Sequence, residues 1–221
     1  MKPIIEARKL SKFYGDFPAL RDLTFTIDQG QCVALLGRNG AGKTTLLKIL
    51  SGLSRPTDGQ ITSTSRISML GHGIGVYDEL TGRENLDFFA SLLPHPVDVP
   101  AWLERVRLDQ VANAPLREYS RGMRQRLALA RTFMGEPELL LLDEPFTSLD
   151  DKSTALLQTL LSEALARHCS IILSTHQIPE AMSLASDILF LDQGRLAYFG
   201  RRPDEMLGDS TWIYRTYGAN R

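Results

Sequence analysis

Apolar residues along the 221-residue chain gather in short runs separated by amphipathic segments. Near-continuous apolar runs occur at QCVALLG, ELLLLD, SIILST and ILFLD. Such runs predict buried strands of a parallel sheet, and the segments between them predict helices on both of its faces. IIEARKL and TFTI predict two earlier strands, ITSTSRISML predicts two short ones, and QGRL predicts a hairpin turn between ILFLD and AYFG. The pattern is typical of an α/β protein.

A mostly helical segment interrupts this pattern between Glu79 and Arg131. ELTGRENLDFFASLL predicts a helix with Thr81 as N-cap and Glu84 as its capping-box partner. AWLERVRLDQVA predicts a second helix, and YSRGMRQR begins a third, whose first turn Ser120 can cap. We therefore expect one domain with an α/β core (about 1–71 and 132–200), a helical subdomain (about 72–131) and a packed C-terminal tail (about 201–221).

Composition and charge narrow the choice of partners. The chain has 25 Lys and Arg against 26 Asp and Glu, so its formal net charge of −1 gives no reason to expect nucleic acid as a partner. Cys32 and Cys169 lie in strand-like runs and are expected to be buried, reduced thiols. No run reaches the ~18 apolar residues of a membrane span, and the N-terminus lacks the apolar core of a signal peptide. We expect a cytoplasmic protein that meets a membrane only through a partner.

One motif predicts a phosphate site. GRNGAGKTT follows a strand and opens a helix, which is the context that the pattern G-x-x-x-x-G-K-[ST] requires. Its glycines let backbone amides surround the β-phosphate, Lys43 brings positive charge to the β- and γ-phosphates, and the hydroxyl of Thr44 suits Mg²⁺. The nucleotide-binding residues expected here are Gly37, Arg38, Asn39, Gly40, Ala41, Gly42, Lys43, Thr44 and Thr45.

LLLLDEP supplies the second half of such a site. Asp143 follows four leucines at the end of a strand, where it can hold Mg²⁺ through water. Glu144 comes next and can orient and deprotonate the attacking water. The two motifs together predict a protein that binds ATP with Mg²⁺ and hydrolyses it.

Five motifs in order carry a family likeness: GRNGAGKTT, YSRGMRQR, LLLLDEP, SLD at 148–150 and STHQ at 174–177. In this order and spacing the chain resembles ABC-transporter ATPase subunits, from Tyr14 to about Phe199. The resemblance implies a P-loop NTPase core with a mostly parallel sheet, an N-terminal antiparallel β region and an inserted helical subdomain. It also implies ATP and Mg²⁺ as cofactors.

The resemblance assigns roles to three further residues. Tyr14 matches the aromatic residue that stacks on adenine, His176 matches the histidine that contacts the γ-phosphate and orders the attacking water, and Asp150 matches the loop that passes between two subunits. The catalytic residues expected on this basis are Lys43, Glu144 and His176. Plainer roles stay open: a strand-end aromatic for Tyr14, a structural histidine for His176 and a helix N-cap for Asp150.

The YSRGMRQR stretch matches the family's signature, which usually reads Leu-Ser-Gly-Gly-Gln. In the family two ATPase subunits pair head to tail, and the signature of one caps the ATP of the other. Here Ser120, Arg121, Gly122 and Met123 would face the ATP of the partner subunit. Tyr119, Arg121 and Met123 depart from the usual residues, and Arg121 either reaches phosphate or points to solvent.

A second departure concerns His72, which stands where the family usually has a Gln that reaches Mg²⁺. The LGH run, with DEPFTSLD and THQ, is similar to the haem-exporter ATPases of bacterial cytochrome c maturation. We expect transmembrane permease subunits and a second ATPase subunit as partners, at the cytoplasmic face of the bacterial inner membrane. Val76 and Tyr77 are candidate docking residues.

Three alternatives remain open from the sequence. The chain resembles almost as well the ATPases of two-component efflux pumps for drugs, lipids or peptides. It is also compatible with a soluble ABC ATPase that acts on a non-membrane partner. The altered signature leaves room for a regulatory subunit that does not hydrolyse ATP.

Overall fold

The computed structural model describes residues 2–63, 66–71, 75–147, 149–209 and 211–218, which form two sheets. The smaller sheet is antiparallel, with the order β2-β1-β4, and contains β1 (Pro3–Tyr14), β2 (Phe17–Asp28) and β4 (Asp58–Ser63). The larger sheet has the order β5-β6-β7-β3-β8-β9 and is parallel except for β9. Its strands are β3 (Cys32–Leu36), β5 (Ile67–Leu70), β6 (Leu139–Asp143), β7 (Ser170–Ser174), β8 (Asp187–Asp192) and β9 (Arg195–Arg201).

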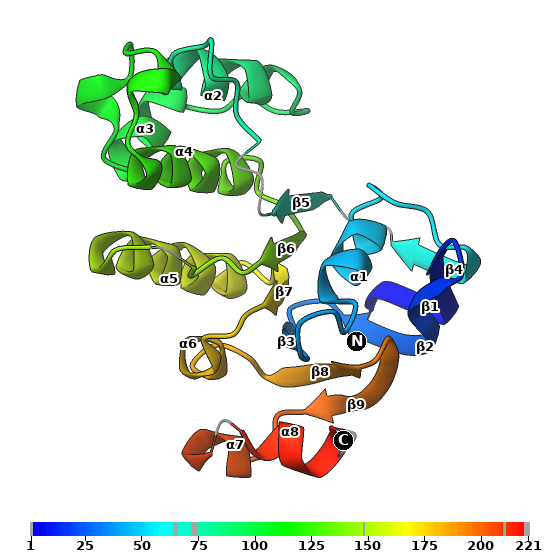
Figure 1. Ribbon diagram of the computed structural model, residues 1–221. Helices are drawn as coiled ribbons and strands as arrows, with labels where there is room; N and C mark the ends of the chain where they lie inside the picture. The colour runs from blue at the N-terminus through cyan, green and yellow to red at the C-terminus, as the bar shows by residue number, and fades with distance from the viewer. Residues whose placement is uncertain (1, 64–65, 72–74, 148, 210, 219–221) are drawn as a thin grey trace.

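Helices cover this larger sheet and extend beyond it (Figure 1). They are α1 (Lys43–Leu50), α2 (Gly82–Ser91), α3 (Val99–Arg105), α4 (Arg121–Phe133), α5 (Asp151–Ala166), α6 (Ile178–Met182), α7 (Glu205–Gly208) and α8 (Trp212–Tyr217), with single 3₁₀ turns at η1 (Asp109–Val111) and η2 (Leu116–Glu118). The mixed, mostly parallel sheet and the N-terminal antiparallel sheet confirm the expected α/β class.

The core lies on both faces of the larger sheet because side chains alternate along each strand. On β3, Ala34 and Leu36 face the apolar cluster that includes α5, whereas Val33 and Leu35 face the one that includes α1 and the smaller sheet. Every residue of β3, β6 and β7 is buried. This two-sided burial explains the near-continuous apolar runs in the sequence.

Both cysteines are buried and free, as expected. Burial is the main cause that raises the pKa of Cys32 to about 12 and that of Cys169 to about 11. At neutral pH both side chains are therefore protonated thiols and behave as small apolar groups.

The middle helices enclose an apolar cluster of their own, which includes Leu86, Leu103, Leu116 and Leu127. Thr81 and Glu84 form the expected capping box at the start of α2. The prediction of one helix over AWLERVRLDQVA was wrong, because α3 ends at Arg105 and a 3₁₀ turn follows. Arg107 has a φ of 57°, and this left-handed residue turns the chain so that the flanking Val106 and Leu108 are both buried.

The C-terminal tail packs on the β8–β9 side of the larger sheet (Figure 1). Met206 of α7 and Ile213 of α8 are buried in the same cluster as α5, as expected of a packed tail. The hairpin between β8 and β9 turns at Gln193 and Gly194, which both have positive φ, as the QGRL stretch predicts. Among the residues described, no helix is long and apolar enough to cross a membrane.

Candidate nucleotide-binding site

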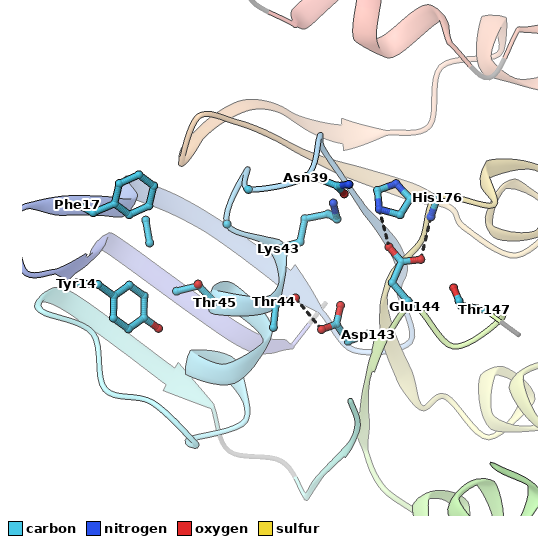
Figure 2. A pocket seen from close by; sticks show the side chains of 13 residues that line it. Tyr14, Phe17, Asn39, Lys43, Thr44, Thr45, Asp143, Glu144, Thr147 and His176 are labelled. Carbon is cyan, nitrogen blue, oxygen red and sulfur yellow. Dashed lines mark hydrogen bonds and ion pairs between the residues drawn. The ribbon is translucent and has the colours of Figure 1, made fainter. Parts of the chain in front are cut away.

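A cleft of about 510 Å³ opens where β3 and β6 end at the same edge of the larger sheet (Figure 2). Ligands of open α/β sheets bind at this edge, outside the carboxyl ends of the strands. The cleft is lined by Tyr14, Phe17, Ala19, Asn39, Gly40, Gly42, Lys43, Thr44, Thr45, Asp143, Glu144, Thr147 and His176. Ten of these were expected from the sequence, and Phe17, Ala19 and Thr147 were not.

The phosphate loop takes its shape from glycines in conformations that other residues rarely adopt. Gly40 and Gly42 have φ values of 79° and 105°. A Cβ atom on Gly42 would lie 2.6 Å from Leu20 Cδ2 and 2.7 Å from the carbonyl oxygen of Ala19. Gly42 is also the N-cap of α1, so the unpaired amides at the start of that helix face the cleft.

Lys43 places a buried cation at the centre of this loop. Its Nζ atom donates to the carbonyl oxygens of Gly37 at 2.7 Å and of Arg38 at 3.3 Å. Burial lowers the pKa of Lys43, while the nearby carboxylates of Glu144 and Asp143 oppose that change. The loop therefore offers amides and one ammonium group to an anion, which is the donor set that a polyphosphate needs.

Asp143 connects this loop to the centre of the sheet. Its Oδ2 atom accepts from the hydroxyl of Thr44 at 2.8 Å, and its Oδ1 atom accepts from the hydroxyl of Ser174 at 2.5 Å. Ser174 lies beside Asp143 because β6 and β7 are paired in that register. Within the described residues no group of three or more His, Cys, Asp or Glu side chains could hold a metal.

Glu144 and His176 form the far wall of the cleft, and Figure 2 shows their side chains facing each other. The Oε2 atom of Glu144 accepts from the backbone amide of His176 at 3.1 Å, and Oε1 lies 3.2 Å from Nε2 of the same residue. Glu144 has a φ of 55°, and its amide donates to the carbonyl oxygen of Ser174 at 3.0 Å. Its Oε1 atom is buried, and its one close polar neighbour among the described residues is the Nε2 atom of His176. A buried carboxylate oxygen in this state suits a water molecule.

Two aromatic side chains stand at the open end of the cleft. Tyr14 and Phe17 are paired across the β1–β2 hairpin, so they share one face of the smaller sheet. They are 51% and 63% exposed, which is unusual for aromatic rings of this size. The sequence singled out Tyr14 and missed Phe17, although the two-residue turn between them already placed the rings opposite each other.

Comparison with known proteins assigns the chain to a family. A family profile described as ABC transporter matches residues 20–147, which is more than half of the chain. The chain belongs to the ABC transporter family. As a member of that family it is an ATPase, and the matched segment contains the phosphate loop, Asp143 and Glu144.

Individual relatives extend the likeness to almost the whole chain. The Nod factor export ATP-binding protein I of Rhizobium meliloti is 36% identical over 236 aligned residues, which cover 98% of this chain and 70% of that protein. The cytochrome c biogenesis ATP-binding export protein CcmA 2 of Cupriavidus metallidurans is 39% identical over 189 residues, which cover 79% of this chain and 90% of that protein.

Solved structures confirm the fold. An ATP-binding subunit of an ABC transporter has a TM-score of 0.82 and 29% identity, and the match covers 98% of this chain and 95% of the other. A dimeric ATP-binding cassette bound to ADP and Pi has a TM-score of 0.81 and covers 90% of this chain and 99% of its own. At 22% identity the second match shows the fold alone.

The family signature lies outside the cleft that holds the phosphate loop. Ser120 is the N-cap of α4, and its hydroxyl accepts from the backbone amide of Met123 at 3.2 Å. A Cβ atom on Gly122 would meet none of the described residues within 4 Å, so no contact with them requires a glycine there. Arg121 lines a separate cleft of about 210 Å³ that also contains Asp143 and Glu144.

Tyr119, which replaces the family's usual leucine, is part of the core of the middle helices. The ring is buried, and its hydroxyl donates to the carbonyl oxygen of Val111 at 2.7 Å. A Cβ atom on Gly82 would lie 2.2 Å from that hydroxyl, so the glycine makes the room that the larger ring needs. The subunit thus accommodates the larger Tyr119 side chain beside Gly82, and Ser120 remains at the start of α4.

Two other expectations concern positions near the ends of elements. Asp150 is the N-cap of α5, and its side chain accepts from the backbone amide of Ser153 at 2.8 Å. Hydrogen bonds from the side chain of Ser153 and from this amide lower the pKa of Asp150. This contact shows the capping role, and the intersubunit role stays a prediction. His72 and Ser148 lie outside the residues that the structure describes.

We predict that Tyr14→Ala weakens ATP binding by about fivefold to tenfold, because aromatic stacking on a base contributes about 1–3 kcal/mol. Titration of the isolated subunit with a fluorescent ATP analogue measures the change. Phe13→Ala is the matched control, since Phe13 is exposed on the same strand but does not line the cleft. Equal affinities for the wild type and Tyr14→Ala would assign adenine stacking to Phe17 or to neither ring.

Proposed function

We propose that this ATPase energises an export transporter, acting as a pair of cassettes attached to membrane-spanning partner subunits at the cytoplasmic face of the membrane. The observation that carries the hydrolytic part is the buried Oε1 atom of Glu144, which lies beside the phosphate loop and has only the His176 ring as a close polar neighbour among the described residues. A water held there would be aligned with a phosphate bound by Lys43. We therefore assign Glu144 as general base and favour a hydrolysing subunit over a regulatory one.

ATP and Mg²⁺ fit the donors present. The exposed rings at the open end suit a base, and the amides and ammonium of the phosphate loop suit the phosphates. Thr44 and Asp143 present adjacent oxygens, and two protein ligands are enough because Mg²⁺ keeps waters and phosphate oxygens in its shell. When bound, the ion would neutralise charge on the β- and γ-phosphates. His72 is a further candidate ligand from the sequence.

His176 has two contacts that suit a role in the same step. Its amide fixes one carboxylate oxygen of Glu144, and its ring lies beside the other. The ring itself is 53% exposed, so it can also reach a γ-phosphate in the cleft. We assign it to orienting the attacking water and the phosphate, while Glu144 takes the proton.

A second ATPase subunit would complete the site. Ser120 and Arg121 are exposed, and the open space at Gly122 would allow close approach of another molecule. The start of α4 places backbone amides beside the side chain of Arg121, a set of groups that suits an anion. Ser120, Gly122 and Met123 do not line the subunit's own phosphate cleft, and Arg121 lines an adjoining cleft with Asp143 and Glu144. We therefore propose that Ser120, Arg121, Gly122 and Met123 contact ATP held by a second copy.

An aromatic cluster of two exposed rings, Tyr77 and Phe88, and the half-buried ring of Phe89 is our proposed docking surface for the membrane partner. The ring of Tyr77 lies 5.3 Å from that of Phe88 and 5.9 Å from that of Phe89. The buried Asn85 holds the backbone of Tyr77 from both sides, with contacts of 2.8 and 3.0 Å. Rigid, exposed rings are a common feature of interaction surfaces.

The same cluster is connected to the sheet edge next to the nucleotide cleft. The guanidinium of Arg131 lies 5.1 Å from the centre of the Phe89 ring and donates to the carbonyl oxygens of Gly75 and Met69. A groove of about 480 Å³ beside it contains Arg131, Met69 and Thr44. A helix from the partner seated there would touch residues next to the phosphate loop, which supports coupling between transport and hydrolysis.

The transported substrate is a separate part of the proposal. We propose haem export for cytochrome c maturation as the first candidate, supported by the relative named for cytochrome c biogenesis. The relatives named for Nod factor export support the efflux-type alternative. Deleting the gene separates them: loss of covalently bound haem from c-type cytochromes supports the first, and unchanged cytochromes contradict it.

We predict that the double variant Tyr77→Ala, Phe88→Ala lowers recovery of the tagged chain in the membrane fraction at least about fivefold when it is co-expressed with the membrane subunits encoded beside it. Leu207→Ala is the control, because it removes an exposed apolar side chain far from this surface. ATP binding by the isolated variant should be unchanged. Recovery of the wild-type chain without any membrane partner would favour a soluble ABC ATPase.

A further inference from the structure

Phe17 presents a large apolar ring to the nucleotide cleft. Its side chain is 63% exposed, whereas Ala19, the other wholly apolar side chain of the cleft lining, is 7% exposed. Among the described residues, no aromatic ring and no cation packs on the Phe17 ring. An exposed apolar ring inside a cleft indicates a ligand that covers it.

The backbone holds Phe17 in a fixed place relative to the phosphate loop. Phe17 is the first residue of β2, and the ring of Pro18 restricts the backbone that follows it. Ala19 comes next, and its carbonyl oxygen packs so closely on Gly42 that a Cβ atom there would lie 2.7 Å from it. Gly42 is the N-cap of α1, so β2 connects the Phe17 ring to the loop that would hold the phosphates. A ring placed in this way loses little freedom when a ligand stacks on it.

A cation covers one face of the Tyr14 ring, which lies opposite Phe17 in the β1–β2 hairpin. The Nζ atom of Lys12 lies 5.2 Å from the centre of the Tyr14 ring and donates to the carbonyl oxygen of Arg55 at 2.8 Å. The ammonium group leaves the other face of Tyr14 for a base. Figure 2 shows both rings at the end of the cleft away from Glu144. Phe17 therefore offers a base at this end a second ring.

We propose that Phe17 is a nucleotide-binding residue whose ring contacts the base of ATP directly, beside the contact that Tyr14 makes. The inference rests on the proposed placement of ATP, with its phosphates at the loop around Lys43, and is independent of the cargo. Stacking on a ring tolerates any base, because every base has a π-face. A phenyl group also has no polar atom that could read the edge of a base. The contribution of Phe17 should therefore be the same for adenine and guanine.

The test is Phe17→Ala in the full chain, with ATP, GTP and inorganic tripolyphosphate as the probes of a calorimetric titration. Loss of one stacking ring is expected to weaken the binding of both nucleotides by about threefold to tenfold. Tripolyphosphate has no base, so its affinity should not change. An unchanged affinity for ATP would overturn the role of Phe17. An equal loss for tripolyphosphate would also overturn it, because the substitution would then act on the phosphate loop.

Phe13→Ala is the matched control, because Phe13 pairs with Pro18 in the same hairpin, is 42% exposed and does not line the cleft. It should bind all three probes like the wild type. Both substitutions remove an exposed ring, so without nucleotide each variant should melt within about 2 °C of the wild type. A fall in melting temperature confined to Phe17→Ala, with wild-type affinities, would make the ring a structural part of the hairpin and overturn its role in binding.

A double variant separates direct contact from an effect through Tyr14. If Phe17 contacts the base itself, Phe17→Ala should still weaken ATP binding about threefold or more when Tyr14 is already alanine. No further loss in that background would show that Phe17 only positions the Tyr14 ring, and would overturn the direct contact. Lys43→Ala in the same titration reports whether ATP binds at the loop. Normal binding by that variant would contradict the placement of ATP itself, whereas weak binding beside an unaffected Phe17→Ala would contradict the role of Phe17 alone.

Discussion

Replacing Glu144 with glutamine is expected to lower ATP turnover by about 100-fold to 10,000-fold and to trap an ATP-bound dimer. The amide has nearly the shape of the carboxylate, so the backbone at φ 55° and the packing under His176 should persist. What disappears is the basic carboxylate oxygen that faces the His176 ring at the wall of the cleft. Without a base for the attacking water, ATP should stay intact between the phosphate loop of one subunit and the signature helix of the other.

Light scattering after gel filtration with ATP and Mg²⁺ measures this outcome as a doubling of molecular mass. Glu138→Gln is the matched control, since Glu138 precedes β6 at the opposite end from Glu144 and its carboxylate contacts Arg66 on the surface. The control should hydrolyse ATP like the wild type and should not accumulate as a dimer. A Glu144→Gln subunit that stayed monomeric with ATP and Mg²⁺ would contradict the proposed composite site.

Local features of this site were predictable because each depends on a few neighbouring residues. The capping box of Thr81 and Glu84 and the N-caps at Ser120 and Asp150 involve contacts within about four positions, and the phosphate loop is one short continuous stretch of sequence. The parallel core followed from apolar runs that need burial on both faces. These patterns are short in range, so one sequence contains them completely.

Contacts between distant segments were not predictable in the same way. Ser174 meets Asp143 only through the register of β6 and β7, and Tyr214 lines a cleft with Gly37 only because α8 packs on β8. The room for Tyr119 comes from Gly82, a residue in another helix. Side-chain type gives no signal for such pairings. The break at Arg107 was missed for a related reason, because burial of its neighbours outweighed the helical pattern.

Replacing Lys43 with alanine is expected to weaken the binding of ATP and ADP by about 100-fold, since a charge-assisted contact in a partly buried site contributes about 3 kcal/mol. Lys43 is 8% exposed and supplies the ammonium group inside the phosphate loop. The variant also leaves the carbonyl oxygens of Gly37 and Arg38 without their donor. The first effect removes a charge that binds the phosphates, and the second loosens the loop that surrounds them. The affinities for ATP and ADP should therefore fall together.

Calorimetric titration of the isolated subunit measures both affinities. Lys48→Ala is the control, because Lys48 lies on the same helix, is exposed and does not line the nucleotide cleft. Circular dichroism should show the same helix content in both variants, which separates a lost ligand contact from a misfolded loop. Because burial opposes the charge of Lys43 in the empty site, the variant should keep a melting temperature close to that of the wild type. A large fall in melting temperature with retained affinity would make Lys43 a structural cation that holds the loop and does not bind the phosphates.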